Sequence, residues 1–228
     1  MRSLRATLAT HSKIVVDLVF PPLCLICGKR MQDEAYLCKN CLDGFVLREN
    51  PVDKFSISGE VYITTTWALF DFDANFQSLI HHLKYSRKRK PIIRTLDYYE
   101  SQIMDLILHP TYDYVVPVPL HPRKQRERGY NQTQVVCEWF APRMKAQLGG
   151  HLVVRTTYTR SQTKLNALER EKNVQKAFKY SGKAELAGAS ILIIDDVLTT
   201  GATSNALAHE LLNNGAGGVD LITLSSPA

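Results

Sequence analysis

The chain has 228 residues, of which 45% are hydrophobic and 22% are charged, a composition typical of one large or two small globular domains and not of a disordered protein. Its formal net charge of +6 and its sequence pI of about 9.0 favour an acidic partner such as phosphate or nucleic acid. No apolar run reaches the roughly 18 residues of a membrane helix, and Lys13 and Asp17 interrupt the first apolar stretch where a secretion signal needs an uncharged core. We therefore expect a cytoplasmic protein without a transmembrane segment.

The first predicted element is a short amphipathic helix that ends before Pro21 and Pro22, because proline terminates a helix. We assign this helix and the cysteine-rich segment behind it to an N-terminal region, residues 1–50, and the rest of the chain, residues 51–228, to a second domain. The candidate apolar positions of the helix are Leu4, Leu8, Val15, Leu18 and Val19.

Four of the five cysteines form two CxxC pairs with ten residues between them. Pairs with this spacing can turn four thiolates toward one point, as tetrahedral Zn²⁺ requires. Two disulfides or free thiols are the alternative, although stable disulfides are rare in the cytoplasm. Because four thiolates leave no open coordination position, we expect a structural and not a catalytic zinc ion. The predicted ligands are Cys24, Cys27, Cys38 and Cys41, whereas Cys137 lies in a helical pattern and is interpreted as a buried apolar residue.

Beyond residue 50 the sequence alternates between strand and helix patterns. A strand-like stretch over 56–72 precedes helical patterns over 74–85 and 90–108. Further strands are expected within residues 112–120, 151–156, 191–197 and 218–225, with helices near Asn131, over 163–178 and over 202–215. This order predicts an α/β domain with a mostly parallel sheet and helices on both faces.

The segment ILIIDDVLTTGAT, residues 191–203, joins an apolar strand to two acidic residues and a loop rich in threonine and glycine. Ligands of open α/β sheets bind at the carboxyl ends of strands, where Asp195 and Asp196 are expected as catalytic residues. The loop offers a phosphate its backbone N–H groups, its hydroxyls and the start of a helix. Carboxylates repel phosphate, so the acid pair should face sugar hydroxyls or a cation, and a sugar phosphate satisfies both demands. The predicted phosphate-binding residues are Thr199, Thr200, Gly201, Ala202 and Thr203.

Two other interpretations of this segment are weaker. A Walker B element would need a GxxxxGK[ST] loop to hold a triphosphate, and the sequence contains none. Simple capping of the following helix needs neither two acids nor three threonines.

The same segment resembles the 5-phosphoribosyl-1-pyrophosphate (PRPP) binding motif of the type I phosphoribosyltransferases. Together with the cysteine pairs, LKY at 83–85, VPVPLHPRKQRERGYNQ at 116–132 and RSQTKLNALEREKNVQKAF at 160–178, it makes nearly the whole chain similar to the ComF family, in particular to ComFC-type competence proteins and their GntX-like relatives. The resemblance implies a type I phosphoribosyltransferase-like sheet behind a small zinc ribbon or knuckle. It also implies a cytoplasmic protein of natural transformation that handles incoming single-stranded DNA, with other competence proteins at the inner membrane as candidate partners.

Two basic segments are candidate anion sites. Residues 84–94 hold six lysines and arginines and no acid, and residues 121–132 lie near the position where a loop of PRPP enzymes covers pyrophosphate. Arg126 and Arg128 are expected to neutralise pyrophosphate, and Tyr130 to stack on a base. An ordinary solvated face is the alternative for both segments. The predicted pyrophosphate- or DNA-binding residues here are Lys84, Arg123, Arg126, Arg128, Tyr130, Asn131 and Gln132.

A polar stripe is expected on the helix after residue 160, where Gln162, Asn166, Arg170 and Asn173 follow one another at steps of four, four and three. Such a stripe can read a base edge or a phosphodiester, or it can form a polar outer face. By resemblance, Gln162, Arg170 and Asn173 match recurrent ComF positions.

Two functions remain open at this point. One is a competence-associated protein that handles single-stranded DNA and keeps a PRPP-binding site. The other is an active phosphoribosyltransferase that moves phosphoribose from PRPP, bound with Mg²⁺, to an unidentified acceptor. The sequence has no evident hood segment for a purine or pyrimidine, which leaves open whether the domain is an enzyme.

Overall fold

The computed structural model describes residues 21–31, 36–52, 60–86, 88–107, 111–157 and 177–227. The predicted N-terminal helix and the polar stripe with Gln162, Arg170 and Asn173 lie outside these ranges. None of the described helices is long and apolar enough to cross a membrane.

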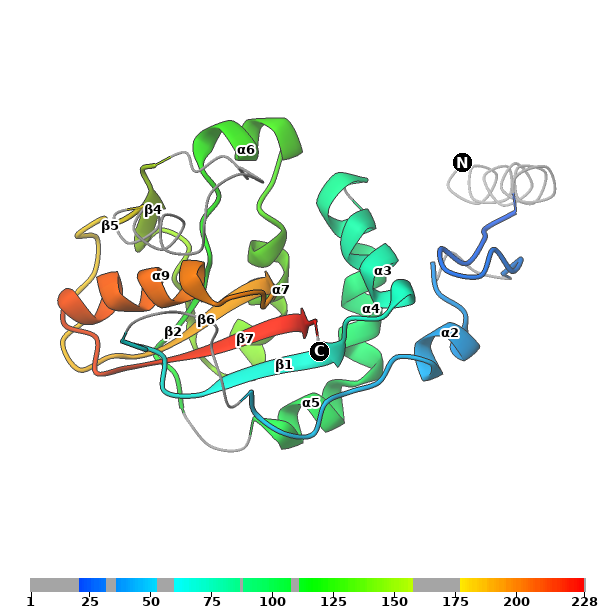
Figure 1. Cartoon of the computed structure of the whole chain (residues 1–228), viewed down its shortest axis with the longest axis horizontal. Helices are drawn as coiled ribbons and strands as arrows, with labels where there is room; N and C mark the ends of the chain where they lie inside the picture. Colours follow the sequence, from blue (N-terminus) through cyan, green and yellow to red (C-terminus); the bar gives the residue numbers. More distant parts are fainter. Residues whose placement is uncertain are drawn as a thin grey trace, which may run out of the picture.

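Five of the described strands form one parallel sheet (Figure 1), which confirms the predicted fold class. The strand order is β1-β7-β6-β2-β3, and every neighbouring pair is parallel. The two neighbouring inner strands, β7 and β6, are buried along most of their length, as expected for strands that are covered on both faces, and β6 contains a continuous apolar run from Ile191 to Ile194. The strands are β1 (Thr66–Asp71), β2 (Tyr114–Pro117), β3 (Gln147–Leu148), β6 (Ser190–Val197) and β7 (Gly218–Ser226).

Helices cover both faces of the sheet, as predicted. Alternate residues of β6 point to opposite faces, so that Leu192 and Ile194 join one apolar core while Ile191 and Ile193 join the other. The first core lies under α3 (Ala74–Tyr85), α4 (Lys90–Tyr98), α5 (Glu100–Leu106) and α7 (Gln132–Arg143). The second lies under α9 (Ala202–Asn213), which Figure 1 shows running along the sheet.

The structure differs from the expected alternation in several places, and Phe178, the last residue of the helix expected over 163–178, lies instead in a strand. The strand expected near residues 151–156 is β4 (Val153–Arg155), but it pairs antiparallel with β5 (Phe178–Tyr180) in a separate two-stranded sheet. The basic segment after β2 contains a short helix, α6 (Pro122–Arg128), where a loop was expected. Proline at the first position favours this helix, and Gly129 ends it in the left-handed conformation with φ 79°.

The segment that carries the four paired cysteines, residues 21–31 and 36–44, is called the cysteine module below. It packs directly on the domain that holds the parallel sheet, called the sheet domain. The module contains the short helix α2 (Lys39–Asp43), and the Phe45 ring that follows lies 5.3 Å from Phe76 and 6.3 Å from Phe70, centroid to centroid. The chain then runs beside β1, where the backbone N–H of Arg48 donates to the carbonyl of Leu69 at 2.8 Å. The two regions therefore share one apolar core.

Candidate functional site

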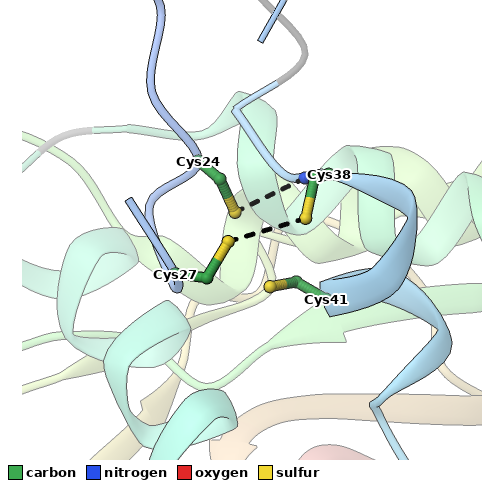
Figure 2. Close-up of side chains that lie close together, drawn as sticks. All are labelled: Cys24, Cys27, Cys38 and Cys41. Carbon is green, nitrogen blue, oxygen red and sulfur yellow. Dashed lines mark hydrogen bonds between the residues drawn. The ribbon is translucent and has the colours of Figure 1, made fainter. Parts of the chain in front are cut away.

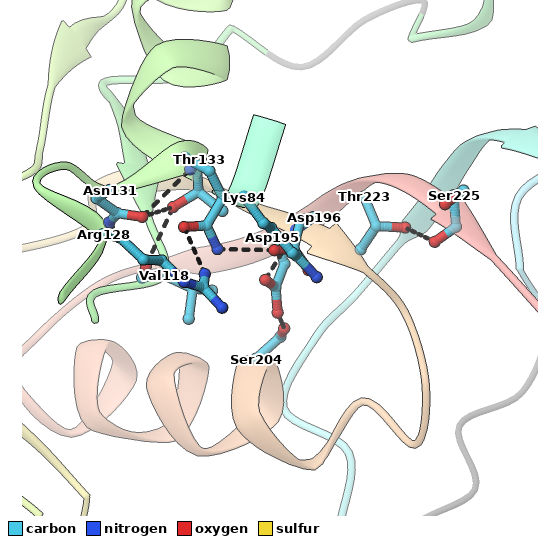
Figure 3. A network of polar contacts seen from close by, with 11 residues as sticks. Lys84, Val118, Arg128, Asn131, Thr133, Asp195, Asp196, Ser204, Thr223 and Ser225 are labelled. Carbon is cyan, nitrogen blue, oxygen red and sulfur yellow. Dashed lines mark hydrogen bonds and ion pairs between the residues drawn. The ribbon is translucent and has the colours of Figure 1, made fainter. Parts of the chain in front are cut away.

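Both acidic residues lie within β6, at its carboxyl end, and not beyond it. The Asp196 side chain points toward α3 and α7 and is only 12% exposed (Figure 3). Its Oδ1 lies 3.0 Å from Nζ of Lys84, and its Oδ2 accepts a hydrogen bond from Nε2 of Gln132 at 2.7 Å. Both oxygens of Asp196 therefore have protein partners.

The side chain of Asp195 lies on the opposite face of β6 and contacts the first turn of α9. Its Oδ1 accepts from the backbone N–H of Asp196 at 2.8 Å, and its Oδ2 accepts from the Ser204 hydroxyl at 3.0 Å (Figure 3). Burial, and after it the charge of Asp196, raise the pKa of Asp195, while those two hydrogen bonds and the charge of Lys84 oppose the shift, and the net result is a pKa of about 7. This carboxyl group consequently changes charge near neutral pH.

The threonine and glycine loop joins β6 to α9. Gly201 is the residue before the helix and adopts the left-handed conformation with φ 80°, which glycine enters at little cost. Glycine has no side chain to cap the helix, and the N–H of Ala202 donates a hydrogen bond of 3.3 Å to the Thr200 hydroxyl. A helix start of this kind presents N–H groups and a positive dipole to an anion.

Cationic side chains from three elements, α3, α6 and β4, lie around the acid pair. Lys84 comes from α3, and Arg128, at the end of α6, donates through Nη1 to Oε1 of Gln132 at 2.9 Å. Burial lowers the pKa of Lys124, and the charges of Arg155, Arg128 and Lys84 lower it further. Burial also lowers the pKa of Arg155, while the charge of Asp195 opposes that shift. These couplings indicate that Lys84, Arg128 and Arg155 lie near Lys124, and that Lys84 and Arg155 also lie near the acids.

The sequence did not predict that Arg155 and Ser204 lie near Asp195. Arg155 lies in an ordinary strand pattern, and Ser204 in the interior of a predicted helix, so neither carries a local signal. Only the tertiary structure brings them to Asp195.

The other predicted residues are more scattered. Tyr130 is 8% exposed, its hydroxyl donates to the carbonyl of Leu83, and the Arg89 guanidinium lies 4.6 Å from its ring centroid, so little of the ring is open to a base. Asn131 caps α7, since its Oδ1 accepts from the N–H of Thr133 at 3.2 Å. Arg123 makes an exposed ion pair with Glu127, and Arg126 is exposed.

A cavity of about 470 Å³ adjoins the site. Gly129 and Asn131, which connect α6 to α7, form one part of its wall, and β4 forms another. Arg155 lines it as well and so faces both the cavity and Asp195.

The four predicted zinc ligands converge on one point (Figure 2). Their Sγ atoms all lie within 4.8 Å of one another, and Sγ of Cys27 and Sγ of Cys38 are 3.7 Å apart. A tetrahedral ion with Zn–S bonds of about 2.3 Å places its sulfurs about 3.8 Å apart, so this set fits zinc. Burial opposes ionisation of Cys24, but hydrogen bonds from the backbone of Cys27, Cys38 and Ile26 outweigh it and lower the pKa of the thiol to about 6. All four thiols are free, and none is in a disulfide.

Two protein families match separate parts of the chain. The double zinc ribbon domain family matches residues 15–52, and the phosphoribosyl transferase domain family matches residues 135–227. DNA utilization protein YhgH of Escherichia coli strain K12 is 34% identical over 159 residues, which cover 66% of this chain and 67% of that protein. Competence protein F of Haemophilus influenzae is 29% identical over 196 residues, covering 83% of this chain and 78% of that protein. Competence protein ComFC of Bacillus subtilis is 25% identical over 203 residues, covering 89% and 77%. The chain therefore belongs to the ComF/YhgH family of competence and DNA utilization proteins, with a zinc ribbon ahead of a phosphoribosyltransferase domain.

Proposed function

We propose that this protein binds PRPP with Mg²⁺ at the carboxyl end of β6 and single-stranded DNA on the adjoining basic surface, in the service of DNA uptake or utilization. The observation that carries the proposal is the pair Asp195 and Asp196, set between several cations and the open start of α9. This arrangement matches the mixed character of PRPP, which has sugar hydroxyls in its middle and phosphate groups at both ends.

Each part of PRPP has a complementary group. The 5′-phosphate would accept from the loop of Thr199, Thr200, Gly201, Ala202 and Thr203, at the positive end of α9. The ribose hydroxyls would donate to Asp195 and Asp196, in place of Ser204 and Lys84. The pyrophosphate would face the cations Lys84, Lys124, Arg128 and Arg155.

Mg²⁺ prefers oxygen ligands, and the acid pair supplies carboxylate oxygens beside the proposed pyrophosphate position. Asp195 and Asp196 would hold it together with the ligand's phosphates. When bound, the ion would neutralise part of the pyrophosphate charge.

Isothermal titration calorimetry with PRPP and Mg²⁺ tests this site. We expect the double variant Asp195→Asn and Asp196→Asn to bind PRPP at least tenfold more weakly, because amides accept poorly from ribose hydroxyls and bind Mg²⁺ weakly. The matched control is Asp105→Asn, an exposed carboxylate on α5 outside the site, which should bind as the wild type does. Equal affinity of the double variant and the wild type would remove the acid pair from the proposal.

The DNA surface is tested by the salt dependence of oligonucleotide binding. Each phosphate contact contributes about −0.7 to the slope of log K against log salt for single strands, so Arg126→Ala with Arg128→Ala should flatten the slope by roughly 1.4. The control is Arg48→Ala, whose guanidinium pairs with Asp71 at 2.7 Å beside β1. If the arginine pair changes neither DNA affinity nor slope while PRPP binding is lost, these residues belong to the pyrophosphate and not to DNA.

A second candidate function is phosphoribosyl transfer, which the cavity of about 470 Å³ favours because its volume lies in the range of small-ligand sites. Arg155 connects that cavity to Asp195. The test is release of pyrophosphate from PRPP over a panel of acceptors that includes single-stranded DNA. Release with any acceptor supports transfer, and PRPP binding without release across the panel supports the binding function.

A further inference from the structure

Tyr85, the last residue of α3, is 64% exposed, which is unusual for a large aromatic side chain. Its ring nevertheless contacts two other side chains. The His81 ring lies 4.8 Å away between centroids, and the Arg128 guanidinium carbon lies 5.5 Å from the Tyr85 centroid. Because so little of Tyr85 is buried, packing of the α3 core does not explain its aromatic ring.

A closed series of contacts connects this ring to the acid pair. Arg128, beside Tyr85, donates to Gln132, which donates to Asp196. Asp196 pairs in turn with Lys84, the residue directly before Tyr85. The exposed ring therefore lies next to Arg128, whose contacts lead through Gln132 to Asp196.

We propose that Tyr85 is the platform on which a base of single-stranded DNA stacks at this site. Sites for single strands combine cations that contact the backbone with aromatic rings that stack on bases, and every base has a face that can stack. Tyr85 supplies the exposed ring, Arg128 supplies positive charge 5.5 Å from its centroid, and Lys84 is the residue before it in the chain. Tyr130, which the sequence had suggested for this role, has its ring buried.

This inference rests on the DNA-binding part of the proposed function and makes it more specific. A base on Tyr85 would place the sugar and phosphate of its nucleotide next to the cations that surround Asp195 and Asp196. PRPP and the strand would then occupy adjoining positions in one site.

The experiment measures fluorescence anisotropy of a labelled oligothymidylate with the full-length, zinc-loaded protein. Stacking on an aromatic side chain is worth about 1 to 3 kcal/mol per base, so Tyr85→Ala should weaken binding by about 5- to 150-fold. The salt slope should stay unchanged because the ring carries no charge. Tyr85→Phe should bind like the wild type, since it keeps the ring. The matched control is Tyr98→Ala on α4, another tyrosine exposed by 40%, which should also bind like the wild type.

Two further measurements separate the possible failures. Tyr85→Ala should keep the wild-type melting temperature and PRPP affinity, which shows that its site is intact. If the wild type binds DNA and Tyr85→Ala binds it equally well, the platform is overturned while the proposed function stands. A wild type that does not bind DNA removes the DNA part of the proposed function and this inference with it, whatever the result with PRPP.

Two other results would relocate the contact. If Tyr98→Ala loses oligonucleotide binding and Tyr85→Ala does not, the inference is overturned. The DNA would then bind near the cysteine module. If thymidine 5′-monophosphate binds as tightly as the oligonucleotide and depends equally on Tyr85, the ring binds a free nucleotide. That result would overturn the proposal that the ring binds single-stranded DNA.

Discussion

The cysteine module and the acid-pair site are built on opposite principles. The module draws its four thiols from one short stretch of chain, and they surround a point that a single ion can fill. The acid-pair site draws on α3, α6, α7, β4, β6 and α9, and opposite charges there balance one another. We infer that loss of one residue disables the module as a whole, whereas the acid-pair site loses function by degrees.

The largest effect that this contrast predicts comes from Cys24→Ser. Structural zinc contributes an apparent free energy of about 10–16 kcal/mol in zinc-finger peptides, so removing one of four ligands should abolish stoichiometric zinc and destabilise the module by several kcal/mol. Metal analysis and thermal denaturation measure both changes. Cys137→Ala is the control, because this cysteine is buried in α7 outside the cluster and its loss should leave zinc in place. Full zinc content in Cys24→Ser would contradict the assignment.

The same contrast explains what the sequence could predict. The zinc ligands were predictable from spacing alone, since CxxC pairs fix a local geometry. The parallel sheet and its helices followed from apolar periodicity, and Asp195 and Asp196 from their place after an apolar run. The ion pair of Lys84 with Asp196 spans more than a hundred residues of sequence, and Arg155 and Ser204 lie in ordinary strand and helix patterns. No local pattern encodes such contacts, because they depend on how the elements pack.

Lys84→Met is predicted to have the next largest effect. The side chains of Lys84 and Asp196 are only 21% and 12% exposed, so losing the lysine leaves a mostly buried carboxylate with Gln132 as its remaining side-chain donor in the described part of the chain. Breaking a buried ion pair costs about 3–5 kcal/mol, and we expect the lower end here because part of the pair is hydrated. Urea denaturation measures the loss.

Two variants sharpen that measurement. Adding Asp196→Asn to Lys84→Met should recover most of the lost stability, since it removes the uncompensated charge. Lys39→Met removes an exposed pair with Asp43, in which the side chains are 74% and 45% exposed, and should change stability much less. If Lys84→Met and Lys39→Met lose the same free energy of unfolding, the ion pair of Lys84 with Asp196 does not stabilise the acid-pair site.

The pH dependence of stability should come in part from Asp195. Burial raises its pKa from 3.8 to about 7 in the folded protein, so the folded state binds this proton more tightly than the unfolded state does. The contribution of Asp195 to stability is therefore greatest below about pH 4 and falls as the pH rises toward 7. Asp195→Asn should remove this fall, and its stability relative to the wild type should increase between pH 5 and pH 8, which denaturation at several pH values measures. Parallel curves for the two proteins would show that Asp195 is ionised throughout this range.

The smallest predicted effect concerns the contact between the two regions. The Tyr99 hydroxyl is buried and lies 2.7 Å from the carbonyl oxygens of both Leu42 and Phe45, to which it donates. Tyr99→Phe keeps the ring against Phe70 but leaves these buried carbonyls without that donor, so it should lower the free energy of unfolding by about 1–2 kcal/mol and leave zinc bound. The control is Tyr98→Phe, because Tyr98 is 40% exposed and water can replace its hydrogen bond to Asp43. Equal stability of Tyr99→Phe and the wild type would mean that apolar contacts such as that of Phe45 with Phe76 suffice to join the module to the sheet. A loss of zinc in Tyr99→Phe would mean instead that the sheet domain also helps to hold the geometry of the four thiols.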